Sequence, residues 1–242
     1  MNSYFEDLEN QGICTLYLDY ADSSSIHAAF NRVMKATGGS LYALFNNGAY
    51  GQPGAVEDLT RDTLRSQFET NLFGWHELTR LVTPVMRQQN EGRIIHNSSM
   101  LGFAAMSHRG AYNASKFALE GLADTQRLEL RGTNIHISLI EPGPIRSRFR
   151  ANAYQKFIEN IDFEQSVHQT TYKKMIARLN KEGDAAPFTL PPEAVLKKVV
   201  HALESKCPKV RYYVTFPTYL FGFLKRFLSS RQMDWLLHNI GK

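Results

Sequence analysis

Residues 92–116 read GRIIHNSSMLGFAAMSHRGAYNASK, and they contain the junction between a strand and a helix that decides the fold. Gly92–Ser98 is short and apolar, which is typical of a buried β-strand. Tyr112 opens a helical stretch that extends to Arg131 and ends before Gly132. A strand followed by a helix of this length predicts a βαβ unit in a parallel sheet.

The same alternation of strands and helices continues on both sides of this segment. The strand segments are apolar throughout, as expected for a sheet covered on both faces. The sequence therefore predicts an α/β fold with a mostly parallel sheet, in one domain spanning residues 1–242. The other expected strands are 13–19, 41–46, 135–140 and 210–216, and the other expected helices follow Asp22, cover 62–89 and run from Pro191 to about Ser205.

Composition narrows the class of protein. The chain has 242 residues, of which 43% are hydrophobic, so a packed core is expected. Cys14 and Cys207 are too few for a disulfide framework or a cysteine zinc site, and we expect two buried thiols in a reducing compartment. The N-terminus lacks the features of a secretory signal and no apolar stretch approaches a membrane span, which favours a cytoplasmic location.

The distribution of charge and the spacing of histidines indicate whether nucleic acids or metal ions are expected to bind. The net charge is +5, but no run of Lys and Arg exceeds two residues, so we expect no nucleic-acid partner. The eight histidines show no His-x-x-x-His spacing, so we also expect no metal site.

Polar and glycine residues follow the predicted strands. The carboxyl ends of parallel strands meet at one edge of a sheet, where ligands bind in open α/β folds. We therefore expect a ligand site built from these four strand ends: Asp19-Tyr20, Asn46-Asn47-Gly48, Asn97-Ser98-Ser99 and Glu141-Pro142-Gly143.

Tyr112 and Lys116 are candidates for proton chemistry. Their spacing of four places both side chains on one helix face. A nearby ammonium stabilises a phenolate, so we expect the pKa of Tyr112 to be lowered. A tyrosine of this kind can exchange a proton with a carbonyl or alcohol oxygen, and the Ser99 hydroxyl could polarise the same oxygen. A bare Tyr-x-x-x-Lys pair is usually surface packing, but the combination with a preceding strand and Ser-Ser-x-x-Gly is far more specific.

With these motifs the chain resembles a short-chain dehydrogenase/reductase of the single-domain type. The resemblance is firm over about residues 13–150 and looser over 190–216. It implies a Rossmann-type doubly wound sheet and oxidation of an alcohol or reduction of a carbonyl with NAD or NADP. The matching catalytic positions are Asn71, Ser99, Tyr112 and Lys116, and the matching cofactor positions are Asp19, Tyr20, Asn47, Tyr112, Lys116, Pro142, Gly143, Ile145 and Ser147.

Two departures from the family pattern affect this reading. The family's Asn-Asn-Ala-Gly is replaced by Asn46-Asn47-Gly48-Ala49. The family's first strand, glycine-rich phosphate loop, first helix and second strand have no counterpart, so we expect an N-terminally truncated sheet and cannot read the choice between NAD and NADP. The alternative function is therefore a non-catalytic remnant or interaction protein on a dehydrogenase scaffold.

The remaining expectations concern the substrate, the C-terminal tail and assembly. Residues 150–190 are expected to form an irregular, variable substrate loop, and the pocket is expected to take an apolar alcohol, aldehyde or ketone. Residues 217–242 form a basic amphipathic extension, which could lie on an anionic membrane, although we favour packing over the substrate pocket or at a subunit contact. The resemblance also implies a homo-oligomer that uses helices near 75–88 and 112–131.

Overall fold

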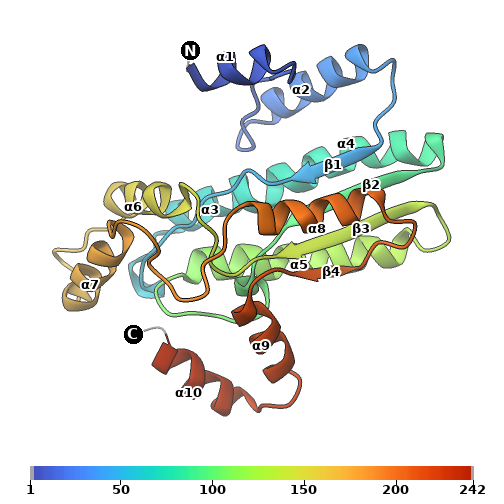
Figure 1. Ribbon diagram of the computed structural model, residues 1–242. Coiled ribbons are helices and arrows are strands. Elements are labelled where there is room, and N and C mark those ends of the chain that lie inside the picture. Colours follow the sequence, from blue (N-terminus) through green and yellow to red (C-terminus); the bar gives the residue numbers. More distant parts are fainter. Residues whose placement is uncertain (1–2, 241–242) are drawn as a thin grey trace.

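A four-stranded parallel sheet forms the centre of the computed structural model, which describes residues 3–240 (Figure 1). Its strands are β1 (Ala43–Asn46), β2 (Gly92–Asn97), β3 (Ile135–Glu141) and β4 (Arg211–Tyr213), in the spatial order β1-β2-β3-β4. Phe45 is paired with Ile95, and Ile95 with Ser138, so the carboxyl ends of the strands lie at one edge. The predicted α/β class with a parallel sheet is confirmed.

Helices cover both faces of the sheet. On one face, α2 (Ser23–Ala36), α4 (Gly74–Gln89) and α5 (Gly110–Glu129) enclose a core that includes Ile94 and Ile137. On the other face, α8 (Glu193–Glu204) packs against Ile95 and Ile140. Neighbouring residues of β2 thus point to opposite cores, which explains why the strands are apolar throughout.

The segment before α4 is not one continuous helix. It consists of α3 (Arg61–Phe68) and a π-helical turn, Glu69–Phe73, that leads directly into α4. Pro84 lies inside α4, and the helix continues through it. A π-helical turn widens the backbone by one residue and is often found at functional sites. Here it contains Asn71, whose side chain is fully buried.

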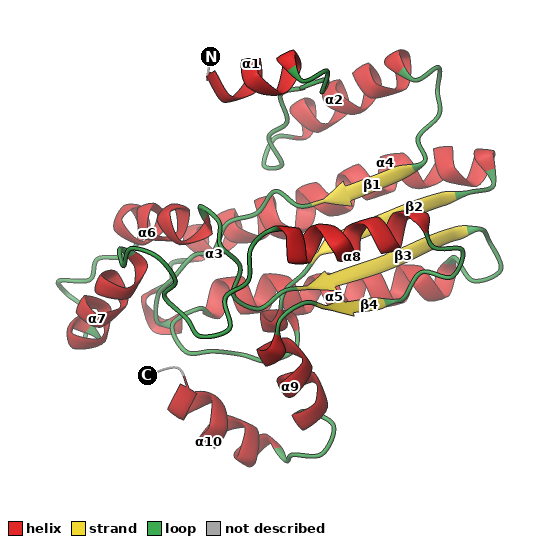
Figure 2. Cartoon of the chain, viewed as in Figure 1, coloured by secondary structure: helices red, strands yellow, loops and turns green. Residues whose placement is uncertain are grey.

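The predicted strand at 13–19 is wrong. The segment between α1 (Ser3–Asn10) and α2 has no regular secondary structure, and β1 forms an edge of the described sheet (Figure 2). Ile13 and Tyr17 are exposed, although Leu18 packs against the core. A strand requires hydrogen bonds to a neighbouring strand, and none of the described strands lies beside this segment.

Residues 150–190 are also more regular than predicted. They contain most of α6 (Phe149–Asn160) and all of α7 (Gln169–Leu179), which enclose a core of their own with Phe157 and Tyr172 fully buried. The Tyr172 hydroxyl accepts a hydrogen bond of 2.8 Å from the Ala55 amide and donates one to the Asp58 carboxylate. These bonds fix the two helices to the loop after β1.

The C-terminal extension folds into α9 (Phe216–Leu224) and α10 (Ser230–Ile240), and residues 241–242 lie outside the described part. Phe221 and Met233 are buried against Met100 and Leu101, close to the half-buried Tyr112. We favour packing over the substrate pocket or at a subunit contact for this tail, and the contact with Met100 and Leu101 is compatible with the first of these. None of the described helices is both long and apolar enough to cross a membrane. Contrary to expectation, Cys14 and Cys207 are exposed.

Candidate active site

The loops after β1, β2 and β3 are linked by hydrogen bonds at the carboxyl edge of the sheet. Asn97 Nδ2 donates to Asn47 Oδ1 over 2.6 Å, which connects the loops after β2 and β1. The Met100 amide donates to the Pro142 carbonyl over 2.8 Å, which connects the loops after β2 and β3. Three of the four predicted strand ends therefore form one polar surface.

Ser99 begins a short 3-10 turn, Met100–Gly102, that follows β2. Its Oγ accepts a hydrogen bond of 3.1 Å from the Leu101 amide and lies 3.5 Å from the Pro142 carbonyl oxygen. The side chain is 8% exposed, and its hydroxyl also interacts with the Tyr112 phenol. The predicted pairing of Ser99 with Tyr112 is present in the structure.

Tyr112 lies in the first turn of α5, with its ring edge-to-face against Phe149 at 5.3 Å between centroids. Burial raises the pKa of Tyr112 to about 12, and the Ser99 hydroxyl and the Arg109 guanidinium oppose that rise. The expected lowering of this pKa is therefore not found, because removing the phenolate from water costs more than these neighbours return.

Lys116 is almost completely buried one turn further along α5. Its Nζ donates to the Asn97 carbonyl over 2.7 Å and lies 4.3 Å from the Trp75 ring centroid and 5.7 Å from that of Tyr112. Burial lowers the pKa of Lys116 to about 7, and the Glu120 carboxylate acts in the opposite direction. An ammonium has three donors, and only one of them has a hydrogen-bond partner among the described groups, so Lys116 can donate to a ligand.

Asn71 joins the helix pair to the loop after β1. Its Nδ2 donates to the Tyr50 carbonyl over 2.8 Å and lies 3.4 Å from Ser115 Oγ, while its Oδ1 accepts from the Tyr50 amide over 3.2 Å. Both ends of the amide are thus engaged with protein groups. Asn71 holds the loop beside Tyr112 in place and shows no direct hydrogen bond to Lys116.

Asp19 and Tyr20, the first two predicted cofactor positions, precede α2. Asp19 is exposed and its carboxylate accepts a hydrogen bond from the Ala21 amide, so it shapes the turn before that helix. Tyr20 lies edge-to-face with Trp75 at 6.3 Å, and a Cβ atom added at Gly48 would lie 2.8 Å from the Tyr20 ring. A side chain at Gly48 would therefore displace Tyr20, which gives a physical reason for glycine in the departure from the family's Asn-Asn-Ala-Gly.

Of the predicted cofactor residues after β3, some pack against the other site loops and one is exposed. Pro142 is buried, and Gly143 approaches Thr215 so closely that an added Cβ would lie 2.2 Å from Thr215 Oγ1. Ile145 pairs with Leu190 in an isolated bridge and packs against the α8 core. Ser147 is exposed, and its hydroxyl accepts a hydrogen bond of 3.3 Å from the Phe149 amide at the start of α6.

Sequence reasoning missed Trp75, Arg109 and Tyr50 as parts of this site. Trp75 packs against Lys116, Arg109 influences the Tyr112 phenol, and Tyr50 binds both ends of the Asn71 amide. Trp75 shares a helix face with Asn71 through their spacing of four, and this was the available signal. For Tyr50 and Arg109 no local pattern existed.

The residues present fit the nicotinamide ribose end of a dinucleotide. Asn97 Oδ1 is buried without a hydrogen-bond partner among the described groups, and Lys116 Nζ is bound to the carbonyl of the same residue. An unpartnered acceptor next to an available donor suits a pair of hydroxyl groups.

Comparisons with known proteins agree with this geometry. The family model described as short chain dehydrogenase matches residues 2–157. The uncharacterized oxidoreductase YbbO of Escherichia coli is 40% identical over 96% of this chain and 80% of its own length. The NADPH-dependent 3-dehydrocapnine reductase of Ornithobacterium rhinotracheale is 29% identical over 97% of this chain and 83% of its own length.

A solved structure shows the same fold. The short chain dehydrogenase/reductase of Burkholderia phymatum in complex with NAD superimposes with a TM-score of 0.75, covering 98% of this chain and 82% of that one, at 22% identity. The shared sheet, the family match and the 40% identical oxidoreductase lead to one conclusion. The chain belongs to the short-chain dehydrogenase/reductase family of oxidoreductases.

Proposed function

We propose that the protein is an NAD(P)-dependent oxidoreductase that interconverts an alcohol and a carbonyl on an apolar substrate. The observation that carries this proposal is the convergence of Ser99, Tyr112 and Lys116 at the carboxyl edge of the sheet. When bound, the nicotinamide supplies or accepts the hydride. The protein's part is to orient the reacting oxygen and to move the proton.

In the reductive direction, Tyr112 is the general acid. Because its pKa lies well above 7, the phenol is protonated at neutral pH and can donate to the carbonyl oxygen. Ser99 donates a hydrogen bond to the same oxygen. Lys116 holds the ribose hydroxyls and, when protonated, stabilises the phenolate that forms.

Three groups of residues are assigned to cofactor binding. Asp19 and Tyr20 lie at the adenine end, Asn47 and Lys116 at the ribose, and the segment from Pro142 to Ser147 at the nicotinamide. The Ornithobacterium rhinotracheale reductase is NADPH-dependent and the Burkholderia phymatum protein was solved in complex with NAD, so the chain's own choice between the two is left to experiment. Asn71 is assigned a positioning role through Tyr50.

An apolar substrate is supported by what surrounds the phenol. Tyr112 packs with Phe149 and within a cluster that includes Met100, Met106 and Phe221. Phe157 and Phe163, which the sequence places in the expected substrate loop, lie in the separate core of α6 and α7. Phe188 packs on Phe216, and Phe223 packs on Phe227.

The test compares Tyr112→Phe with Tyr17→Phe, which removes the same hydroxyl at an 81% exposed position. With decanal as substrate and NADPH or NADH as cofactor, Tyr112→Phe should lower kcat by about 10²-fold or more. Tyr17→Phe should match the unmodified protein. Activity of Tyr112→Phe at the native rate would show that this tyrosine is not the acid.

Cofactor binding separates the enzyme from the alternative. Calorimetric titration of the 242-residue chain with NADPH and NADH should give binding, and Lys116→Met should weaken it. If neither dinucleotide binds at millimolar concentration, the chain is better described as an interaction protein on a dehydrogenase scaffold.

A further inference from the structure

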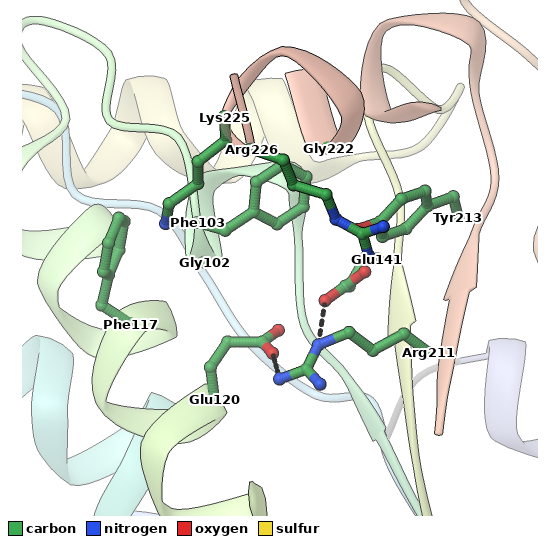
Figure 3. Close-up of a pocket in the computed structure, with 10 residues that line it drawn as sticks. All are labelled: Gly102, Phe103, Phe117, Glu120, Glu141, Arg211, Tyr213, Gly222, Lys225 and Arg226. Atoms are coloured by element: carbon green, nitrogen blue, oxygen red, sulfur yellow. Dashed lines mark hydrogen bonds and ion pairs between the residues drawn. The ribbon is translucent and has the colours of Figure 1, made fainter. Parts of the chain in front are cut away.

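A pocket of about 470 Å³ lies beside the candidate active site and includes none of its catalytic residues (Figure 3). It is enclosed by the turn after β2, by α5, by β3 and β4, and by the end of α9. Its volume is in the range of small-molecule sites. The lining residues are Gly102, Phe103, Phe117, Glu120, Glu141, Arg211, Tyr213, Gly222, Lys225 and Arg226.

One wall of the pocket carries two carboxyl groups with spare acceptor capacity. Glu141 is fully buried; Arg211 Nε lies 3.2 Å from its Oε1 and the Glu120 carboxyl interacts with it, but neither oxygen has a partner with full hydrogen-bond geometry among the described groups. Glu120 accepts from Ser98 Oγ over 2.5 Å and from Arg211 over 3.0 Å. Four carboxyl oxygens have about eight acceptor positions, so even a proton shared between the acids leaves several unfilled.

The opposite wall is positively charged. Lys225 and Arg226 are exposed at the end of α9, and neither forms an ion pair with a carboxylate of the described residues. Figure 3 shows both side chains approaching from the α9 side, with Glu120 and Arg211 on the other side. Burial and the neighbouring Glu120 raise the pKa of Glu141 to about 9, so at neutral pH cations outnumber anions in the lining.

Aromatic rings connect these two walls. Lys225 Nζ lies 5.2 Å from the Phe117 ring centroid and 6.0 Å from that of Phe103, and the Phe103 and Tyr213 centroids are 5.7 Å apart. Gly222 leaves room for Tyr213, because an added Cβ would lie 2.5 Å from its ring. A flat apolar body fits between such rings better than a polar chain.

We propose that this pocket binds a small ring-bearing carboxylate that also carries a hydroxyl group. The carboxylate contacts Lys225 and Arg226, the ring lies against Phe103 and Phe117, and the hydroxyl donates to Glu141. A cationic ligand is disfavoured because it would face Lys225, Arg226 and Arg211. The site is separate from the proposed active site, and its occupancy can be measured without any turnover.

The probe is 6-hydroxy-2-naphthoate, titrated calorimetrically into the 242-residue chain at pH 7. Two analogues test its two polar contacts one at a time. The first, 6-methoxy-2-naphthoate, cannot donate a hydrogen bond to Glu141, and the second, 6-(aminomethyl)-2-naphthol, replaces the carboxylate with a cation. Each should bind roughly tenfold more weakly than the hydroxy acid, since each loses one charged or donated contact.

Protein variants locate the binding. Lys225→Ala combined with Arg226→Ala should weaken the hydroxy acid by about tenfold or more. Lys173→Ala with Lys174→Ala removes the same charge from two adjacent exposed positions of α7 and should leave affinity unchanged. Circular dichroism should show the same fold for both double variants, because all four side chains are exposed.

Three outcomes would overturn the proposal. They are the absence of binding at millimolar hydroxy acid, tighter binding of the amine than of the hydroxy acid, and equal loss of affinity in the two double variants. Dehydrogenase activity is measured separately on the same proteins. Activity without binding of the hydroxy acid would contradict the pocket proposal alone and leave the proposed function intact.

Discussion

The two halves of α5 bury ionisable groups in opposite ways. Tyr112, Lys116, Glu120 and Asp124 follow one another at intervals of four, so they lie along one face of the helix. In the first half, no described carboxylate forms an ion pair with Lys116, whose Nζ donates a hydrogen bond to the Asn97 carbonyl. In the second half, Arg211 lies within 3.0 Å of Glu120, 2.7 Å of Asp124 and 3.2 Å of Glu141.

This difference indicates that Lys116 is available to bind a ligand, whereas Arg211 stabilises the fold. Burying an unpaired ammonium is costly, and here the cost is met by a lowered pKa rather than by a partner. Arg211 instead lies against three acids from α5 and β3, of which Glu141 is protonated at neutral pH, and these contacts tie β4 to the rest of the sheet. Substitutions in the two halves should therefore affect stability in different ways.

The largest expected effect follows from Arg211→Met. It leaves Glu120, Glu141 and Asp124 without their shared cation, and we expect a loss of about 3–5 kcal/mol in the free energy of unfolding. Arg146→Met is the matched control, because Arg146 pairs with Asp184 over 2.8 Å at the exposed surface, where solvent screens the interaction, and its loss should be much smaller. Urea unfolding of both variants measures the contrast, and equal losses would contradict it.

A smaller effect should appear in the pH dependence of Glu141→Gln. The pKa of Glu141 is raised from 4.5 to about 9, so the unfolded chain releases a proton that the folded chain keeps within this window. The unmodified protein should therefore lose stability as pH rises, by about 2 kcal/mol between pH 6 and 8 relative to Glu141→Gln, since glutamine does not titrate. Urea unfolding at both pH values gives the difference, and a constant difference would show that Glu141 is ionised in the fold.

Lys116→Met tests the other half of the helix, where the sign is reversed. The pKa of Lys116 is lowered from 10.5 to about 7, so between these values the unfolded chain binds a proton that the folded chain lacks. The unmodified protein should gain about 1 kcal/mol relative to Lys116→Met between pH 7.5 and 8.5. If the free energy of unfolding of the unmodified protein instead fell with rising pH relative to Lys116→Met, Lys116 would have an acidic partner that keeps it charged.

The smallest effect on the unfolding free energy is expected on another face of α5, where Leu122 lies. In the helix near 112–131, which we expect at a subunit contact, Leu122 is 43% exposed, whereas Leu119 and Ala123 are buried against the chain's own core, so Leu122 remains open to a partner. We propose that Leu122 lies in a homo-oligomer contact. Leu122→Arg should change the unfolding free energy by less than about 0.5 kcal/mol yet shift the mass from light scattering to that of a monomer. A monomeric unmodified protein would remove this proposal.

The strand ends and α5 could be predicted because their signals are local. Apolar runs identify β2 and β3, and the Tyr112–Lys116 spacing places both side chains on one helix face before any tertiary contact is known. The structure moves the start of α5 only to Gly110. The pattern failed at 13–19, where an apolar run had no neighbouring strand to pair with.

Other features depend on contacts between distant residues. Glu120, Glu141 and Arg211 come from three separate elements, and nothing in the local sequence of any one indicates that they meet. The helices α6 and α7 were missed because polar residues interrupt their apolar faces, and burial of Phe157 and Tyr172 becomes evident only when the helices pack together. The pKa of Tyr112 likewise depends on burial, which spacing does not reveal.

The π-helical turn Glu69–Phe73 accommodates one extra residue between two helices. An α-helix advances about 100° per residue, so one residue inserted into a regular helix would rotate everything on one side of it by that angle. The wider π turn absorbs this residue, and α3 and α4 keep their own faces toward the core. Deleting the half-exposed Phe73 would therefore disturb the turn itself, where Asn71 binds both the amide and the carbonyl of Tyr50, more than the helices on either side. A change of length at this place acts on the candidate site rather than on the packing of the helices.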